Sequence, residues 1–117
     1  MIDNKLLNSG TLYSDIIDLD ANITTIAIGL SSIGTAVATV DLQVPVIYGK
    51  QSDLTDNGWI NLTAAHGWDG FPAGQLNGNF SDSVVINNLG YPAVRLKLTH
   101  TSGSSLINAR LNSKINS

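Results

Sequence analysis

Residues 35–48, TAVATVDLQVPVIY, decide the fold class of this 117-residue chain. Apolar and polar residues alternate along most of the segment, so that hydrophobic side chains recur at every second position. Because successive side chains of a β-strand point to opposite faces of the sheet, this period predicts a strand with one buried face. Pro45 has no backbone N–H to donate, and we therefore expect the strand to lie at a sheet edge there or to bulge. The predicted buried face comprises Ala36, Ala38, Val40, Leu42, Val44, Val46 and Tyr48.

Segments of similar composition lie on both sides of this strand. Residues 12–19, 23–30, 59–63 and 83–89 are rich in strand-forming residues, and residues 31–34 are predicted to form a turn before the long strand. Short strands separated by turns about every eight to twelve residues are typical of β-sandwiches and jelly rolls. We therefore predict an all-β fold, an antiparallel β-sandwich or jelly roll.

The C-terminal part of the chain contains a second alternating pattern. In residues 94–99 the apolar side chains alternate with Arg95, Lys97 and Thr99, and a matching alternation follows in residues 107–115. The Thr-Ser-Gly-Ser sequence between the two segments is typical of a turn. We expect an antiparallel hairpin there, with its basic residues on the exposed face.

The composition agrees with a fold that lacks helices. All nine acidic residues are Asp and none is Glu, and the chain has only four Lys and one Met, whereas Thr, Ser, Asn, Val and Ile are plentiful. Helices favour Glu, Lys and Met, and strands and turns favour the residues that are plentiful here. The absence of Cys excludes disulfide bonds and thiolate metal sites. The length suits one domain, which we place at residues 11–117, behind a loose N-terminal arm of residues 1–10.

The charge pattern argues against nucleic acid and membrane as partners. The net charge is −3, and no segment concentrates the six basic residues, which would be needed to neutralise phosphates. Residues 21–40 lack charge and are about long enough to span a bilayer. They contain seven Ser, Thr and Asn residues and have no Lys or Arg at either end, however, so we expect two strands and a turn there. The N-terminal residues show no secretory signal.

Metal binding has little support in the sequence. Residues 53–58, DLTDNG, resemble the start of a calcium loop, but Ala64 stands where a bidentate Glu is required. On a strand, Asp15 points to the opposite face from Asp18 and Asp20, so these three carboxylates do not converge without a bend. We expect a solvated turn and a polar strand surface, and hence neither a metal nor a cofactor.

The sequence predicts no catalytic constellation. Residues 29–33, GLSSI, approximate a nucleophile elbow, but Ile33 replaces its second glycine. His66 and His100 are the only histidines, and the position of His100 at a strand end is more typical of a structural histidine. We therefore predict that the chain is not an enzyme.

Residues 66–80, HGWDGFPAGQLNGNF, form the most suggestive segment for binding. Loops of this length are uncommon in compact domains unless they are functional or disordered. Trp68 and Phe71, set among glycines, suit stacking on a sugar ring or anchoring of a protein contact. In the alternative interpretation, the aromatic side chains of the segment fold back and cover one end of the sandwich. The predicted partner-binding residues are His66, Trp68, Phe71 and Phe80 in this segment, with Leu6 and Leu7 in the N-terminal arm.

Residues 88–106, NLGYPAVRLKLTHTSGSSL, resemble a pattern found in small virion proteins of tailed bacteriophages. The shared features are a loop with Tyr-Pro, a strand with Arg between apolar residues, a Thr-Ser-Gly turn and a final strand that ends near a Lys. Residues 12–19, 35–48 and 59–62, the last of which match W-x-x-L, fall where these proteins have strands. The resemblance therefore covers most of residues 10–115.

Proteins of this kind are β-sandwich or jelly-roll modules, and many are capsid decoration (cement) proteins, often trimers, that sit on the shell. The resemblance implies a structural virion protein on the capsid surface, made in the host cytoplasm, which binds the major capsid protein or another virion protein. It implies no catalytic residues. A homotrimer is also expected because an exposed edge strand near Pro45 must be protected or paired. Two alternatives are a tail- or fibre-associated module and a carbohydrate-binding adhesion module that uses Trp68 and Phe71.

Overall fold

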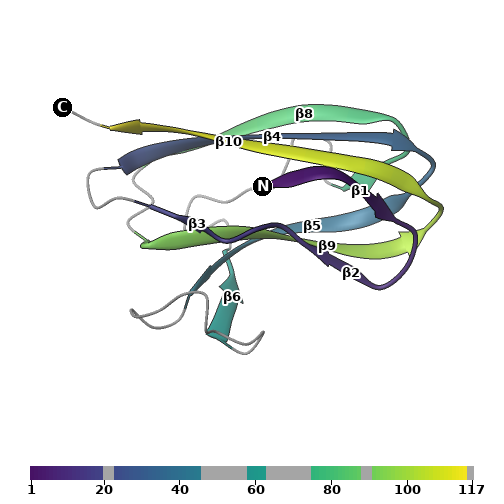
Figure 1. Ribbon diagram of the computed structural model, residues 1–117, viewed down its shortest axis with the longest axis horizontal. Helices are drawn as coiled ribbons and strands as arrows, with labels where there is room; N and C mark the ends of the chain where they lie inside the picture. The colour runs from purple at the N-terminus through teal and green to yellow at the C-terminus, as the bar shows by residue number, and fades with distance from the viewer. Residues whose placement is uncertain (20–22, 46–57, 63–74, 88–90, 116–117) are drawn as a thin grey trace.

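The computed structural model describes residues 1–19, 23–45, 58–62, 75–87 and 91–115. These residues form ten β-strands and no α-helix, and the strands assemble into two antiparallel sheets that pack face to face (Figure 1). The all-β sandwich that the sequence predicts is therefore confirmed. Within the described part of the chain, no helix is long and apolar enough to span a membrane.

The first sheet contains β1 (Ile2–Leu7), β4 (Ile23–Gly34), β8 (Phe80–Asn87) and β10 (Ser105–Ile115). Its strands follow the order β1-β10-β4-β8, and every neighbouring pair is antiparallel. β10 thus lies between β1 and β4, so segments from the two ends of the chain are neighbours in one sheet.

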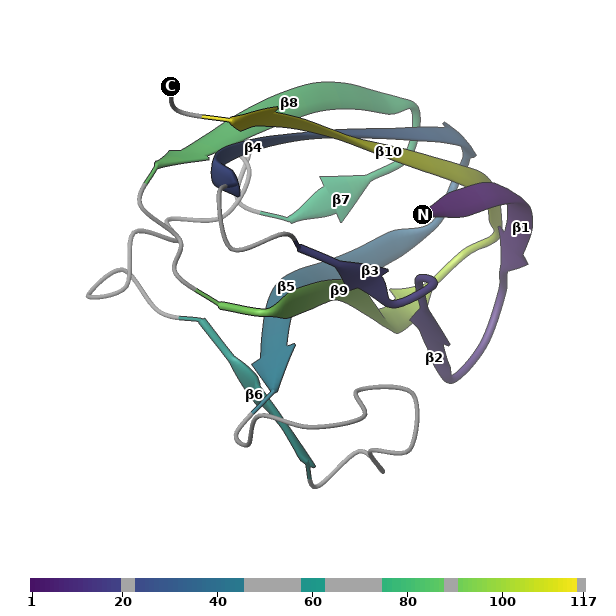
Figure 2. The same ribbon diagram turned by 60° about the vertical axis from the view of Figure 1, so that its left-hand side comes forward.

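The second sheet has six strands, of which four follow the order β2-β9-β5-β6, while β3 also pairs with β9 and β7 with β5. Figure 2 shows the two layers, with β4, β8 and β10 above β5 and β9. The strands of the second sheet are β2 (Thr11–Tyr13), β3 (Ile17–Asp18), β5 (Val37–Pro45), β6 (Trp59–Asn61), β7 (Leu76–Asn77) and β9 (Ala93–Ser102).

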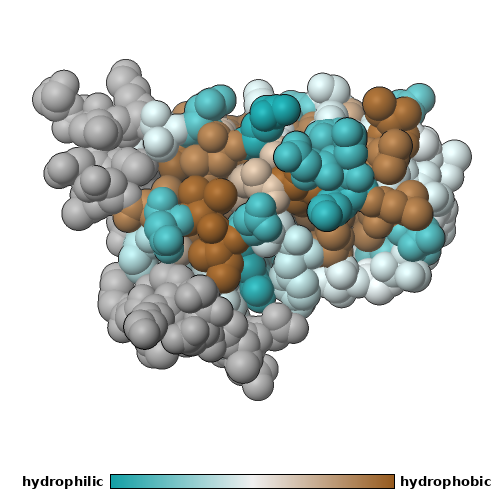
Figure 3. Space-filling model, in the orientation of Figure 1, coloured by the Kyte–Doolittle hydropathy of each residue, from teal (hydrophilic) through white to brown (hydrophobic). Residues whose placement is uncertain are grey.

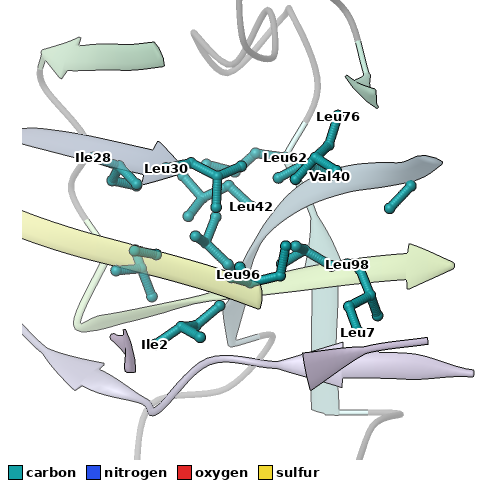
Figure 4. Packing of buried hydrophobic residues seen from close by; sticks show 14 of the residues in the cluster. Ile2, Leu7, Ile28, Leu30, Val40, Leu42, Leu62, Leu76, Leu96 and Leu98 are labelled. Carbon is teal, nitrogen blue, oxygen red and sulfur yellow. The ribbon is translucent and has the colours of Figure 1, made fainter. Parts of the chain in front are cut away.

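The hydrophobic core fills the space between the two sheets (Figure 4). Side chains at alternate positions point inward, so that Ile28 and Leu30 of β4 face Leu42 of β5 and Leu96 of β9. Full burial of a Leu or Ile side chain contributes about 1.5–3 kcal/mol, and this cluster therefore holds the sheets together. The predicted buried positions Ala36, Ala38, Val40, Leu42 and Val44 are confirmed, and Val46 and Tyr48 lie outside the described residues.

Four tight connections carry the chain from one sheet to the other at the same end of the sandwich, to the right in Figure 1. They join β1 to β2, β4 to β5, β7 to β8 and β9 to β10. Gly103 has a φ of 74°, and a Cβ there would overlap the carbonyl group of Thr35. Thr35 in turn donates its backbone N–H to the carbonyl oxygen of Ser104 at 2.8 Å. The close approach of these two connections requires glycine at residue 103.

The N-terminal segment differs from the loose arm predicted for residues 1–10. β1 pairs with β10, and both Ile2 and Leu7 are buried in the core. The register shifts between Ile2 and Lys5, and Asn4 adopts a φ of 45°. Because of this irregularity, Ile2 and Leu7 both face the core although they are five positions apart. The segment therefore lacks the regular alternation of apolar and polar residues that indicates a strand. The segment belongs to the sandwich.

The predicted hairpin of residues 94–99 and 107–115 is wrong. β9 pairs with β2, β3 and β5, whereas β10 pairs with β1 and β4 in the other sheet. The connection at Gly103 takes the chain across the sandwich instead of returning it beside β9. Both strands still place one apolar face in the core, so alternation alone does not distinguish the two arrangements.

Two strand boundaries also differ from the prediction. β4 continues through residues 31–34, where the sequence predicts a turn, because these residues pair with β10. Residues 12–19 contain two short strands, β2 and β3, rather than one. Between them, Ser14 is buried, and its hydroxyl accepts the backbone N–H of Leu96 at 2.8 Å.

Pro45 ends a strand that lies inside its sheet. β5 has β9 on one side and β6 and β7 on the other. Its pairing with β9 ends at Gln43, and Pro45 lies opposite Trp59 of β6. The missing N–H of Pro45 is therefore accommodated at the end of the strand. β5 therefore has neighbours on both sides, and among the described residues only its last two, Val44 and Pro45, lie beyond the pairing with β9, so the edge predicted near Pro45 is short.

Candidate functional site

The structure places the predicted partner-binding residues in different environments. Leu7 is buried in the core, Leu6 is exposed on β1, and Phe80 is half-buried on β8, where it packs against the core. β1 and β8 are the two edges of the four-stranded sheet. The other three predicted residues lie outside the described part of the chain: His66, Trp68 and Phe71.

Three exposed aliphatic side chains form a line across the outer face of the four-stranded sheet. Leu6 of β1 lies opposite Leu106 of β10, and Leu106 lies opposite Ile33 of β4. Their exposed fractions are 56%, 44% and 69%. Figure 3 shows hydrophobic surface at the end of the molecule that carries the tight connections. Single exposed aliphatics are ordinary, but neighbouring ones in contact make an apolar patch, and such patches mark interaction sites. We name Leu6, Leu106 and Ile33 the aliphatic row.

Sequence reasoning singled out only Leu6 of this row. Ile33 falls in the predicted turn, and Leu106 precedes the predicted last strand. A signal does exist for two of the three residues. Leu6-Leu7 and Leu106-Ile107 are pairs of adjacent apolar residues, and two successive side chains of a regular strand do not face the same core. One member of each pair must therefore point outward.

A shallow depression lies beside the aliphatic row on the same face. Gly29 of β4 is at its centre, with Arg110 opposite on β10 and Ser83 opposite on β8. The depression has a volume of about 560 Å³ and is open to solvent. Polar residues predominate around it, and two of them, Asp82 and Arg110, are charged. The polar residues that line it are Ser31, Ser81, Asp82, Ser83, Asn108 and Arg110.

A second depression of about 430 Å³ adjoins the first along β4 and β8. Its lining is mainly apolar, and Ile33 and Phe80 contribute to it. The two depressions share Ser31 and Ser81, so they form one hollow strip over the β4–β8 side of the sheet. The β1–β10 side carries the protruding Leu6 and Leu106.

The part of this outer face whose side chains the structure describes carries little charge. Among its outward side chains described on β4, β8 and β10, only Arg110 is charged. On the outer face of the other sheet, by contrast, Asp41 lies opposite Lys97. Depletion of charge distinguishes the centre of a protein interface from the rest of a surface. The outward residues on the three strands are Thr25, Ala27, Gly29, Ser31, Ile33, Ser81, Ser83, Val85, Leu106, Asn108, Arg110 and Asn112.

The outer face of the six-stranded sheet holds a buried polar network instead of the exposed basic residue that the sequence predicts. Arg95 is only 7% exposed, and its Nε donates to Oε1 of Gln43 at 2.8 Å. Gln43 donates from Nε2 to Oδ1 of Asn61, also at 2.8 Å. The guanidinium carbon lies 4.2 Å from the centre of the Tyr13 ring and 4.6 Å from that of Trp59. Hydrogen bonding and cation–π attraction offset the cost of burying this charge.

The residues that were considered for metal binding and catalysis do not come together in the described part of the chain. Asp15 and Asp18 are exposed, and Asp20 and residues 53–57 lie outside the described residues. No group of three or more His, Asp or Glu side chains is placed to hold a metal ion within the described ranges. His100 braces a connection between the sheets, because its Nε2 lies 2.6 Å from the carbonyl oxygen of Gly103.

Comparison with known proteins assigns no family to the chain. No protein-family model matches it, and no curated protein matches it. Its function is therefore inferred from its own residues.

Proposed function

We propose that this chain is a structural virion protein of a tailed bacteriophage, a decoration (cement) protein that binds the assembled head shell. Its partners are the major capsid protein or another virion protein, and it acts through protein contacts rather than catalysis. The observation that carries this proposal is the charge-poor outer face of the four-stranded sheet with its aliphatic row. The resemblance of residues 88–106 to small virion proteins points in the same direction.

The shape of this face favours a protein partner over a small molecule. Sites for small ligands are clefts that bury most of the ligand, about 70–90% of its surface. The two depressions beside the row are shallow. Leu6 and Leu106 line neither of them, and Ile33 is an exposed side chain at the border of the second. Apolar side chains that project from a flat, charge-poor surface are typical of the centre of a protein interface.

On a shell that repeats the same binding site many times, weak contacts between each decoration protein and the shell are sufficient for attachment. Neighbouring decoration proteins that touch the shell and each other reinforce attachment by avidity, without a large interface in any one contact. An acidic chain without a basic stripe also has little attraction for the nucleic acid inside a head.

Co-sedimentation with phage shells that lack this protein tests the proposal. We expect the wild-type chain to pellet with the shells and to remain in the supernatant without them. The paired substitution Trp68→Ala and Phe71→Ala should weaken pelleting if the predicted loop anchors the protein. Ile60→Ala is the matched control, because Ile60 is a partly exposed aliphatic residue on β6, away from the aliphatic row.

Two results would replace the proposal with its alternatives. A wild-type chain that stays in the supernatant but binds a glycan array tightly would identify a carbohydrate-binding module. Labelling of intact particles by immunogold should mark the head, whereas labelling of the tail or fibres would identify a tail-associated module.

A further inference from the structure

We propose that the outer face of the four-stranded sheet is covered by a second copy of this chain. Two such sheets pack face to face about a two-fold axis that runs along β4. The inference rests on the proposed function in one respect only, that this face is a protein contact surface. It differs from the trimer expected from an exposed edge at Pro45, because only the last two residues of β5 lie beyond its pairing with β9, whereas the outer face of the four-stranded sheet is a larger surface.

Gly29 is the first reason to place another backbone against this face. A glycine inside a strand weakens it and usually marks a bulge, a tight bend or the close approach of another backbone or ligand. The register runs through Gly29 without a shift on both sides, toward Arg110 and toward Ser83, so there is no bulge. Its φ is not positive, and a Cβ at this position would meet nothing within 4 Å. Nothing in the described part of the chain requires glycine here, which points to the approach of another molecule.

The second reason is that the face is complementary to itself about this axis. A two-fold axis along β4 places β10 of one copy over β8 of the other and keeps both aliphatic rows at the same level. Ile33 then meets Ile33 of the other copy at the axis. Leu106 of each copy lies over the apolar depression beside Phe80 of the other. Leu106 of each copy thus fills the hollow side of the other, while β1 with Leu6 extends one strand beyond the other copy.

The charges agree with this arrangement. Arg110 lies one strand to the side of β4, so the axis sets the two guanidinium groups on opposite sides, with backbones about 10 Å apart across the sheet. Each Arg110 then faces the strand that carries the Ser83 hydroxyl of the other copy. Face-to-face contact does not bring like charges into opposition.

The overlapping area fits a small interface. Three strands of each copy overlap, and at a spacing of about 4.8 Å and a length of about ten residues they cover on the order of 500 Å² in plan. Weak interfaces bury up to about 600 Å² of accessible surface on each partner, against about 800 Å² for an ordinary stable one. Two twisted sheets stack in this manner at an angle of about 30° in natural β-sandwiches.

Sedimentation velocity of the purified chain at micromolar concentration tests the inference. We expect the wild type to have twice the 12.3 kDa mass of the chain. Gly29→Lys should raise the dissociation constant of the dimer at least about tenfold, because it inserts a side chain at the axis from both copies. The monomer accommodates this substitution, since a Cβ there meets no neighbour. Leu106→Ser should weaken the dimer as well.

Thr99→Lys is the matched control, because Thr99 is an exposed position on the outer face of the other sheet. It should leave the dimer intact, and the far-UV spectrum of every variant should match that of the wild type. A monomeric or trimeric wild type would overturn the inference, and so would a dimer that survives Gly29→Lys and Leu106→Ser.

The shell assay separates this inference from the proposed function. A monomeric wild type that pellets with shells, and loses pelleting on Gly29→Lys, would show that the face binds the shell instead of a second copy. The proposed function would then stand and the dimer would fall. A dimeric wild type that does not pellet with shells would support the dimer and refute the decoration role.

Discussion

Arg95 is the only charged side chain that is buried among the described residues, and it connects strands that are not neighbours in the sequence. Its guanidinium group stacks between Tyr13 of β2 and Trp59 of β6 and donates to Gln43 of β5. A planar cation with several donors suits such a site, because it can stack and form hydrogen bonds at once. The network therefore fastens three strands to β9 on the outer side of the six-stranded sheet.

We predict that Arg95→Ala lowers the free energy of unfolding by about 2–4 kcal/mol, through loss of the cation–π contacts and an unsatisfied acceptor on Gln43. Arg95→Lys should recover only part of this loss, since an ammonium group has no planar face to stack. Urea denaturation measures both. The matched control is Arg110→Ala, an exposed arginine, which should change stability by less than about 0.5 kcal/mol. Equal effects at the two arginines would contradict a structural role for the network.

At the scale of the element, β1 is an integral strand of the four-stranded sheet and not a loose arm. Deleting residues 1–7 removes Ile2 and Leu7 from the core and leaves β10 with an unpaired edge. We expect a loss of about 3–6 kcal/mol from the two side chains alone. Thermal melting should show a fall on the order of ten degrees or more in a domain of this size. A melting temperature unchanged by the deletion would instead support the loose N-terminal arm that the sequence predicts.

Leu6→Ser is the control for that deletion. Leu6 belongs to the same strand but points outward, so its replacement leaves the core intact. The melting temperature of the isolated monomer should change little, while contacts made by the aliphatic row should weaken. The two variants thus separate the contribution of β1 to the fold from its contribution to binding.

Individual strands show why some parts of the fold could be predicted from the sequence and others could not. The core face of β5 could be predicted, because its apolar side chains are buried at every second position from Ala38 to Val44 and the register shift in its pairing with β9 lies at the start of the strand, between Val37 and Ala38. β1 could not, because the register shift near Asn4 breaks the parity between Ile2 and Leu7. The hairpin predicted for β9 and β10 is wrong, because a strand that crosses to the other sheet has the same alternation as one that returns beside its neighbour.

The candidate face was harder to predict than the fold. Its aliphatic row is assembled from β1, β10 and β4, whose residues Leu6, Leu106 and Ile33 are far apart in the sequence. In the sequence Gly29 is like any other strand glycine, and only the structure shows that none of the described residues approaches the position of its missing Cβ. Only the register between strands reveals such a surface, and register depends on long-range pairing that no local pattern contains.

At the scale of the whole molecule, we predict that stability does not depend on metal ions. The described residues bring together no group of three carboxylate or imidazole side chains, and residues 53–58 lack the Glu of a calcium loop. Thermal melting should be the same in excess EDTA and in excess calcium. A site filled at a hundred times its dissociation constant would add about 2.7 kcal/mol. That corresponds to a rise of about ten degrees, which would refute the prediction.

The place of β10 between β1 and β4 sets the order in which the protein can be completed. A ribosome makes β1 about a hundred residues before β10, and during that interval β1 has no strand beside it. Leu106, the middle residue of the aliphatic row, arrives in the same late segment. A chain released before residue 105 therefore has neither a closed four-stranded sheet nor an assembled contact face. Truncated chains are therefore expected to lack the surface that the proposed contacts require.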